Sequence, residues 1–191
     1  MATMEAGVKE RVYMHQYLRE FFKTGLDEAA KNPVKSYVFG DEYDESKNRL
    51  FLKLLLDHKI KVFENDKDIT SEGKSFKKGK SWIVPTSQPQ YRMVRSMFEK
   101  VMTFADSVFY DASSWTMALA YGMPYATQTV VSGKEIKELP SQTLDFPADG
   151  KYVAYMVDWS DYFAAKFLHH IQSAGVHVEV TAQTFNSNTD Q

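Results

Sequence analysis

The sequence predicts an α/β fold, a three-layer sandwich with a mostly parallel sheet, preceded by a long N-terminal helix. Two observations support this prediction. Short segments rich in β-branched and aromatic residues alternate with amphipathic stretches, and one strand–helix–strand pattern occurs twice, at 34–65 and at 150–185. The two strands of such a unit usually run parallel and are joined by a right-handed crossover. Alternating strands and helices therefore favour helices packed on a mostly parallel sheet.

Length and composition fit one soluble domain with an appended helix. The chain has 191 residues, of which 43% are hydrophobic and 25% charged, and its net charge is −2 with both signs spread along it. This balance argues against a nucleic-acid partner. The lysine-rich run "GKSFKKGK" at 73–80 has no arginine and no helical register. We interpret it as a solvated loop.

The sequence contains no cysteine and no long apolar segment. The lack of cysteine excludes thiol catalysis, disulfides and thiolate metal sites. No apolar run approaches the ~20 residues of a membrane span. The opening "MATMEAGVKERV" lacks the apolar core of an export signal. We therefore expect neither a membrane span nor an export signal in this chain, and cytosol and periplasm fit it equally well.

Residues 1–32 are predicted to form an amphipathic helix before the α/β domain at 33–185, which a polar tail follows at 186–191. Apolar residues recur here at three- and four-residue spacing, namely Val12, Leu18, Phe21, Phe22, Leu26 and Ala29. Pro33 disfavours helix at Asn32 and should end it. The aromatic residues on this face suggest docking onto the rest of the chain or onto a neighbour.

The two repeated units are each predicted to hold a strand, an acidic turn, a helix and a second strand. The helix of the first unit is apolar almost all round, so it should be well buried, and its second strand should cover 60–63. In the second unit a strand is expected at 151–157. Gly175 should end the helix there, before a strand at 176–180.

Between the two units lies "SWIVPTSQPQYRMVRSMFEK" at 81–100, a buried strand followed by a helix. Ser87 and Gln90 have the spacing of a capping box, in which each side chain bonds the backbone N–H of the other residue. No glycines flank the serine as they would in a nucleophile elbow or a phosphate loop. A short helix at 114–121, ended by Gly122 and Pro124, and a strand at 125–131 complete this part.

Carboxylates gather where two of the predicted strands end. In open parallel sheets, ligands bind beyond those ends. Such a crevice would bring together five side chains that are candidate ligand-binding residues: Asp41, Ser87, Gln88, Asp158 and Trp159. The alternative is that Asp44 and Ser160 are helix N-caps and that the other acidic residues are solvated turn residues.

Histidines and aromatic residues give weaker signals. None of the five histidines stands in a zinc-binding motif, although His177 and Glu179 share one strand face. The aromatic stretch at 106–125 has the composition of a core or an interface. A ligand or glycan platform built on Trp115 and Trp159 is the alternative.

Four stretches resemble a known family: "VKSYVFGDEYD", "SWIVPTSQPQYRMVRSMFE", "TFADSVFYDASSWTMALAYGMPY" and "YVAYMVDWSDYFAAKFLHHIQSAGVHVEV". In this order they are similar to the region that follows the peptidase module in large bacterial zinc carboxypeptidase-like proteins of the carboxypeptidase A type. The resemblance covers roughly 10–185. In that family the region looks like a class I glutamine amidotransferase-like domain, which is a flavodoxin-like fold.

The resemblance implies an accessory domain of a zinc carboxypeptidase (metallopeptidase) and not its catalytic part. No His-x-x-Glu occurs in the chain, so zinc is expected only in the peptidase domain, which would be the partner of this chain. Amidotransferase chemistry needs a cysteine nucleophile, which is absent. The resemblance is compatible with export of the parent protein to the periplasm or out of the cell, and the sequence is compatible with homo-oligomers of this chain. Two alternatives remain: a hydrolase that uses carboxylates at the sheet edge, and a small-ligand or glycan-binding module.

Overall fold

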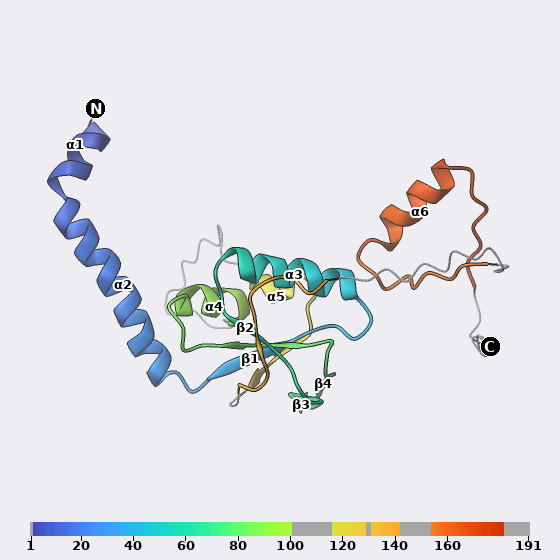
Figure 1. Ribbon diagram of the computed structural model, residues 1–191, viewed down its shortest axis with the longest axis horizontal. Helices are drawn as coiled ribbons and strands as arrows, with labels where there is room; N and C mark the ends of the chain where they lie inside the picture. Colours follow the sequence, from blue (N-terminus) through green and yellow to red (C-terminus); the bar gives the residue numbers. More distant parts are fainter. Residues whose placement is uncertain (1, 101–115, 129–130, 142–153, 182–191) are drawn as a thin grey trace, which may run out of the picture.

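The computed structural model describes residues 2–100, 116–128, 131–141 and 154–181 (Figure 1). Six helices and seven strands are assigned in this part of the chain. Along the sequence they are α1 (Ala2–Lys9), α2 (Arg11–Lys31), β1 (Ser36–Phe39), α3 (Glu45–Asp57), β2 (Val62–Glu64), β3 (Ile69–Ser71), β4 (Lys74–Phe76), β5 (Trp82–Pro85), α4 (Tyr91–Phe98), α5 (Met117–Ala120), β6 (Tyr125–Gln128), β7 (Glu135–Ile136) and α6 (Ala164–Ser173).

The main sheet is antiparallel, so the prediction of a mostly parallel, flavodoxin-like sheet is wrong. Its five strands lie in the order β6-β1-β5-β2-β7, and β1–β5, β1–β6, β2–β5 and β2–β7 are all antiparallel pairs. The first repeated unit does contain a strand, a helix and a strand. β1 and β2 run in the same direction because both are antiparallel to β5, which lies between them. The unit is therefore a split βαβ, in which another strand lies between the two parallel strands. Sequence periodicity does not distinguish it from a βαβ unit whose two strands are neighbours in the sheet.

Different layers cover the two faces of the sheet, as Figure 1 shows. One face carries Tyr37, Phe39 and Val84, which pack into one cluster with side chains of α3, α4 and α5. The other face carries Val38 and Ile83, which pack against the hairpin of β3 and β4. This alternation follows from the two-residue period of a strand. Among the described elements, helices thus cover one face and a hairpin the other, which also corrects the predicted sandwich with helices on both faces.

Helix α3 begins and ends at well-defined caps. The Asp44 carboxylate accepts a hydrogen bond of 2.8 Å from the Lys47 backbone N–H, so the predicted N-cap is confirmed. At the other end the Ile60 N–H donates to Leu55 O, and the Lys59 N–H donates to Leu56 O. This is a Schellman motif, with Lys59 in the left-handed region at φ 59° where glycine is usual.

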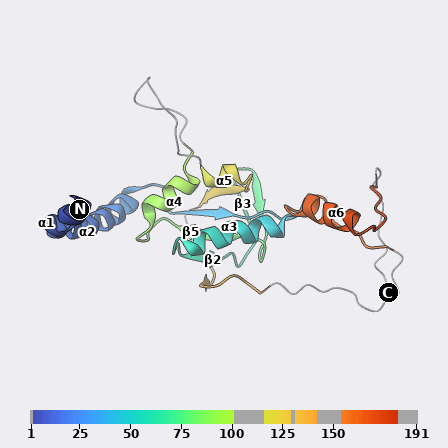
Figure 2. The ribbon, with the colours of Figure 1, turned by 90° about the horizontal axis from the view of Figure 1, so that it is seen from above.

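The predicted N-terminal helix is confirmed as α1 and α2, which are separated by a single turn residue, Glu10. Helix α2 ends at Lys31, before Asn32 and Pro33, as expected. In Figures 1 and 2 it extends away from the sheet. Only Gly25 and Ala29 of α2 are buried.

The second repeated unit forms its helix but not its strands. Helix α6 is followed by Gly175 at φ 77°, so the predicted glycine stop is confirmed. Residues 154–157 and 176–180 are not strands, which contradicts the prediction, while 151–153 lie outside the described residues. In Figures 1 and 2, α6 stands to one side of the sheet, beyond the end of α3. β-forming residues become a strand only where a neighbouring strand pairs with them.

The domain boundary at 33–185 stays a prediction, and the predicted tail at 186–191 lies outside the described residues. No helix in the described ranges combines the length and the apolar character that crossing a bilayer requires.

Candidate functional site

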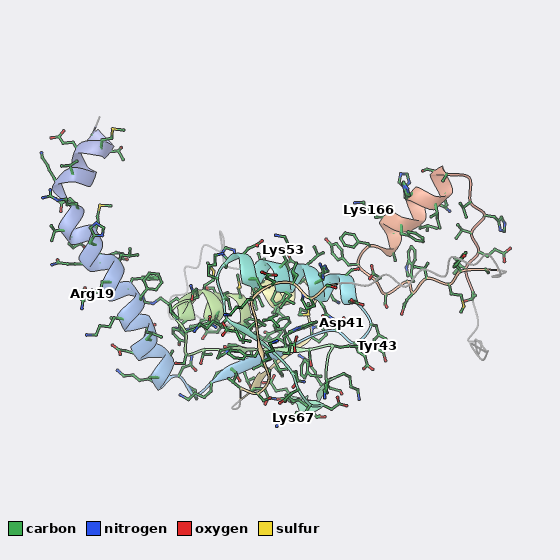
Figure 3. All side chains as sticks on the ribbon, in the orientation of Figure 1. Arg19, Asp41, Tyr43, Lys53, Lys67 and Lys166 are labelled. Atoms are coloured by element: carbon green, nitrogen blue, oxygen red, sulfur yellow. The ribbon has the colours of Figure 1, made fainter. Side chains whose placement is uncertain are left out.

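The turn between β1 and α3 holds Asp41, the most densely bonded of the predicted site residues (Figure 3). Its Oδ2 accepts a hydrogen bond of 2.6 Å from Lys47 Nζ, and the ion pair is largely shielded from solvent. Its Oδ1 accepts from the backbone N–H groups of Tyr43, at 3.0 Å, and Asp44, at 3.3 Å. Burial alone would raise the pKa of the Asp41 carboxyl. Lys47 and the two N–H groups outweigh burial and hold that pKa below its usual value.

Asn48 and Gly40 also determine the conformation of this turn. The Asn48 side chain accepts from Asp41 N at 2.7 Å and donates to Asp41 O at 2.6 Å. Gly40 has φ 152°, and a Cβ at this position would lie 2.3 Å from Lys80 O. Only glycine fits this close approach of two backbones. The Asp41 carboxylate therefore already has structural partners on both oxygens.

Gln88 is buried and ties the segment after β5 to the segment before β2. Its Oε1 accepts from Lys61 N at 2.7 Å, and its Nε2 donates to Pro85 O at 2.7 Å. Both ends of the amide are therefore used by the backbone. Helix α4 begins at Tyr91 with Gln90 as N-cap and without a side-chain cap, so the predicted capping box of Ser87 and Gln90 is wrong. Ser87 is exposed in the turn before that helix.

Asp158 and Trp159 lie on the segment before α6, which Figure 1 shows apart from the sheet. The Asp158 carboxylate accepts from the Ser160 N–H and Oγ, and these hydrogen bonds lower its pKa. The N-cap of α6 is Phe163, so the predicted cap at Ser160 is wrong. Trp159 is 64% exposed.

None of the five predicted site residues forms a hydrogen bond or an ion pair with another of them in the described fold, and their partners are all different. The crevice was expected at the carboxyl ends of parallel strands, and that edge does not exist in an antiparallel sheet, where neighbouring strands end on opposite sides. The ligand-binding role of these residues stays a prediction without a shared site in the described fold.

Metal chemistry has few candidates in the described ranges. No three His, Asp or Glu side chains gather there as metal ligands would. His177 Nε2 lies 3.9 Å from Glu179 Oε1, and both side chains are exposed. Zinc sites need three or four ligands around one point, so this pair alone makes no site.

Helix α2 carries an exposed apolar face that reaches well beyond its contact with α4. The large exposed side chains of this helix are Val12, Tyr13, Met14, Tyr17, Leu18, Phe21, Phe22 and Leu26. Val12 and Tyr13 lie on other sides of the helix, whereas the remaining six lie within one half of its circumference. Single exposed apolar residues are common, but a group of this size on one side of a helix marks an interaction surface.

Arg92 of α4 holds the base of α2. It donates to Phe21 O at 2.8 Å, to Thr24 Oγ1 at 3.0 Å and to Glu28 Oε1 at 2.6 Å. The guanidinium also lies 4.4 Å from the centroid of the Phe21 ring. Asn32 Nδ2 adds a hydrogen bond of 2.8 Å to the Tyr91 hydroxyl. Periodicity predicted the helix, but nothing in the local sequence marks Arg92 as its anchor.

Aromatic residues also gather before and on α6. Tyr155, Trp159, Tyr162 and Phe167 are all exposed, but the rings of Tyr162 and Phe163 meet edge to face, at 88°, and are not coplanar. Trp115, the other proposed platform residue, lies outside the described residues, as does the rest of the first half of the aromatic stretch, 106–115.

Comparisons with protein-family models, with curated proteins and with solved structures find no match. The resemblance to the region after a zinc carboxypeptidase module therefore stays a prediction made from the four quoted stretches.

Proposed function

We propose that the chain is a non-catalytic accessory domain whose N-terminal helix docks onto another protein surface. The observation that carries this proposal is the apolar face of α2, which continues outward from the residues that the domain itself buries. Gly25 and Ala29 are buried at the base of the helix. Counted back from Gly25 in successive steps of three, four and four residues, Phe22, Leu18 and Met14 are on the same side of the helix and exposed. The base of this face therefore packs on the domain, and its outer part is exposed and free to contact a partner.

The charge of this segment favours a protein partner over a membrane surface. Residues 2–31 contain five basic and five acidic residues. Helices that lie on anionic membranes are rich in lysine and arginine on their polar face. A neutral helix with aromatic residues on its apolar side has the composition of a protein interface.

The polar candidates of the core support a non-catalytic role. A general acid or base must be free to reach a substrate. The Asp41 carboxylate is engaged by Lys47 and two backbone N–H groups, and the Gln88 amide is engaged by Lys61 and Pro85. These groups maintain the fold.

For the identity of the partner, the resemblance is the guide. It points to the peptidase module of a zinc carboxypeptidase-like parent protein, with the metal held by that module. An accessory domain of this kind would orient the catalytic module or its substrate, and the α2 face would be its contact.

Two assays of the 191-residue chain test the non-catalytic role. We expect no cleavage of peptides with free carboxyl termini and no stoichiometric zinc by elemental analysis. Tight zinc together with cleavage would contradict the proposal.

A binding assay tests the docking role. We expect the double variant L18E/F22E to lose binding to the peptidase module in calorimetry, because two charges would enter an apolar contact. The variant E20A/K23A on the polar face of the same helix is the matched control and should bind like the original chain. Equal binding by both variants would exclude the α2 face as the contact.

Exposed rings before α6 favour one second candidate, a small-ligand or glycan-binding module. Exposed tryptophan and tyrosine rings stack on sugar faces. In this case soluble oligosaccharides should quench the fluorescence of Trp159, and the variant Trp159→Ala should abolish saturable binding. Unchanged fluorescence across a panel of oligosaccharides would contradict the glycan-binding hypothesis.

A further inference from the structure

Strand β6 ends the main sheet on one side, and side chains occupy its outer edge. β6 pairs with β1 along its inner side. On the other side the Thr127 N–H donates to Glu72 Oε1 at 2.9 Å, and Thr127 O accepts from Ser71 Oγ at 2.9 Å. Lys74 Nζ donates to Tyr125 O at 2.8 Å. Three backbone groups that an added strand would use are thus bonded by three side chains.

All three side chains come from the tip of the hairpin formed by β3 and β4. The tip lies between the paired residues Ser71 and Lys74. Glu72 has φ 50° and Gly73 has φ 73°, as in a two-residue type I′ turn. Asparagine, aspartate or glycine usually occupies the first of these positions, since a longer side chain is strained there. From this position the Glu72 carboxylate accepts hydrogen bonds from the Thr127 N–H and hydroxyl.

We infer that the hairpin tip, defined as 71–74, is an edge guard that keeps β6 from pairing with β6 of a second copy of the chain. Natural sheets protect exposed edges with charged residues, because unpaired N–H and C=O groups pair readily with another chain. The sequence of β6 itself, "YATQ", has no charge. Two charged residues of the guard, Glu72 and Lys74, bond the outer edge of β6 in the described part of the chain.

A second copy is the natural occupant of an unguarded edge. The sheet alternates in direction from strand to strand. Two β6 strands related by a two-fold axis pair antiparallel and continue this alternation across the contact. The short uncharged strand contains a tyrosine and a threonine, both of which favour such pairing. This inference is independent of the α2 face and of the proposed docking role.

The test compares guard variants with the original chain. At a concentration low enough for E72A/K74A to be monomeric, we expect its Thr127 amide to exchange about tenfold faster or more, since charge-assisted hydrogen bonds are lost. We also expect the mean mass in sedimentation to rise with concentration above that of the original chain. The variant Thr70→Ala, an exposed position of β3 in the same hairpin, is the control and should leave both readouts unchanged.

Two single variants separate loss of the guard from damage to the hairpin. Glu72→Gly relieves the strained backbone and keeps the turn while it removes the carboxylate, so it should exchange faster and associate. Glu72→Gln retains an oxygen that can accept from Thr127 but loses the charge, so its exchange and its mean mass should lie between those of the original chain and of Glu72→Gly. The inference is overturned if Thr127 exchange is unchanged in E72A/K74A and Glu72→Gly. It is equally overturned if exchange rises without any increase in mass.

Discussion

The two repeated units have the same local design and different surroundings. In the first, at 34–65, an aspartate-capped helix joins β1 to β2 and packs on one face of the sheet, and its Phe51 is 0% exposed. In the second, described from 154 to 181, α6 ends in the same type of cap, but its Phe167 side chain is 45% exposed. The difference teaches that caps and helices follow from local sequence, whereas strands need a partner edge.

The helix ends show how far the local likeness goes. After α6 the Val176 N–H donates to Ile171 O and the Gly175 N–H donates to Gln172 O, which is the Schellman pattern also found after α3. Residue Gly175 occupies the left-handed position without strain, and Lys59 occupies it with strain. In the first unit the residue after Lys59, Ile60, is buried, as an apolar residue at this position of a Schellman motif often is.

The largest expected difference between the units is the effect of removing a helix phenylalanine. Phe51 contacts the rings of Phe39, Phe98 and Tyr121. We expect Phe51→Ala to lower the free energy of unfolding by about 3–5 kcal/mol, through lost burial and a cavity. Phe167→Ala should cost less than about 1 kcal/mol, as at other exposed sites. Urea unfolding followed by circular dichroism measures the free energy of unfolding of both variants. Equal decreases for Phe51→Ala and Phe167→Ala would contradict the difference in packing between the two units.

The next effect concerns the polar turn of the first unit. Asn48 is buried and bonds both the N–H and the C=O of Asp41. Asn48→Ala should cost about 1–3 kcal/mol, because two backbone groups lose their partner. The corresponding turn of the second unit is exposed, and Asp161 accepts from the Phe163 N–H there. Asp161→Ala should cost about 1 kcal/mol or less. If Asp161→Ala lowers the free energy of unfolding more than Asn48→Ala in the same assay, the turn of the first unit is not the more stabilising one.

The Asp41 carboxylate gives a pH-dependent effect. Its folded pKa is lower than the usual 3.8, so its ionised form stabilises the fold above that pH. The stabilisation is lost as the pH falls through the lowered pKa, below 3.8. We expect Asp41→Asn to cost about 1–2 kcal/mol at pH 7, as for other hydrogen bonds to charged groups. The difference in free energy of unfolding between this variant and the original chain should become smaller below pH 3.8. A difference that stays constant between pH 7 and pH 2.5 would show that the charge of the Asp41 carboxylate does not stabilise the fold.

The smallest effect comes from exchanging the left-handed cap residues. Lys59→Gly should raise the free energy of unfolding by up to about 1 kcal/mol, because relief of the left-handed strain exceeds the entropy cost of glycine. Gly175→Lys introduces that strain into α6 and should reduce its helicity. Thermal unfolding and the circular dichroism signal at 222 nm check the pair. A destabilised Lys59→Gly variant would contradict the assigned backbone geometry.

Sequence signals predicted the helices and several of their ends. Periodicity indicated α2, and Asn32 and Pro33 ended it as expected. Asp44 caps α3, and Gly122 follows α5 at φ 57°. These signals succeeded because helix hydrogen bonds and caps join residues close in sequence. The predicted cap at Ser87 failed because α4 begins later, and the buried Gln88 side chain organises that turn instead.

Strand direction and the contacts of the candidate site were not predictable in the same way. The insertion of β5 between β1 and β2 joins residues far apart in sequence, and a strand has the same period whether its neighbour is parallel or antiparallel. Asp41 was identified as a polar residue at a strand end. Its pairing with Lys47 depends on the three-dimensional path of the turn, and the anchoring of α2 by Arg92 spans two distant helices.

Hydrogen exchange along the chain tests the contrast between the two units most directly. The backbone amides of 37–39 in β1, which is paired on both sides, should exchange slowly, whereas those of 156–157 should exchange at least about a hundredfold faster. Comparable protection in the two segments would contradict the account, because it would place 156–157 as a strand within a sheet.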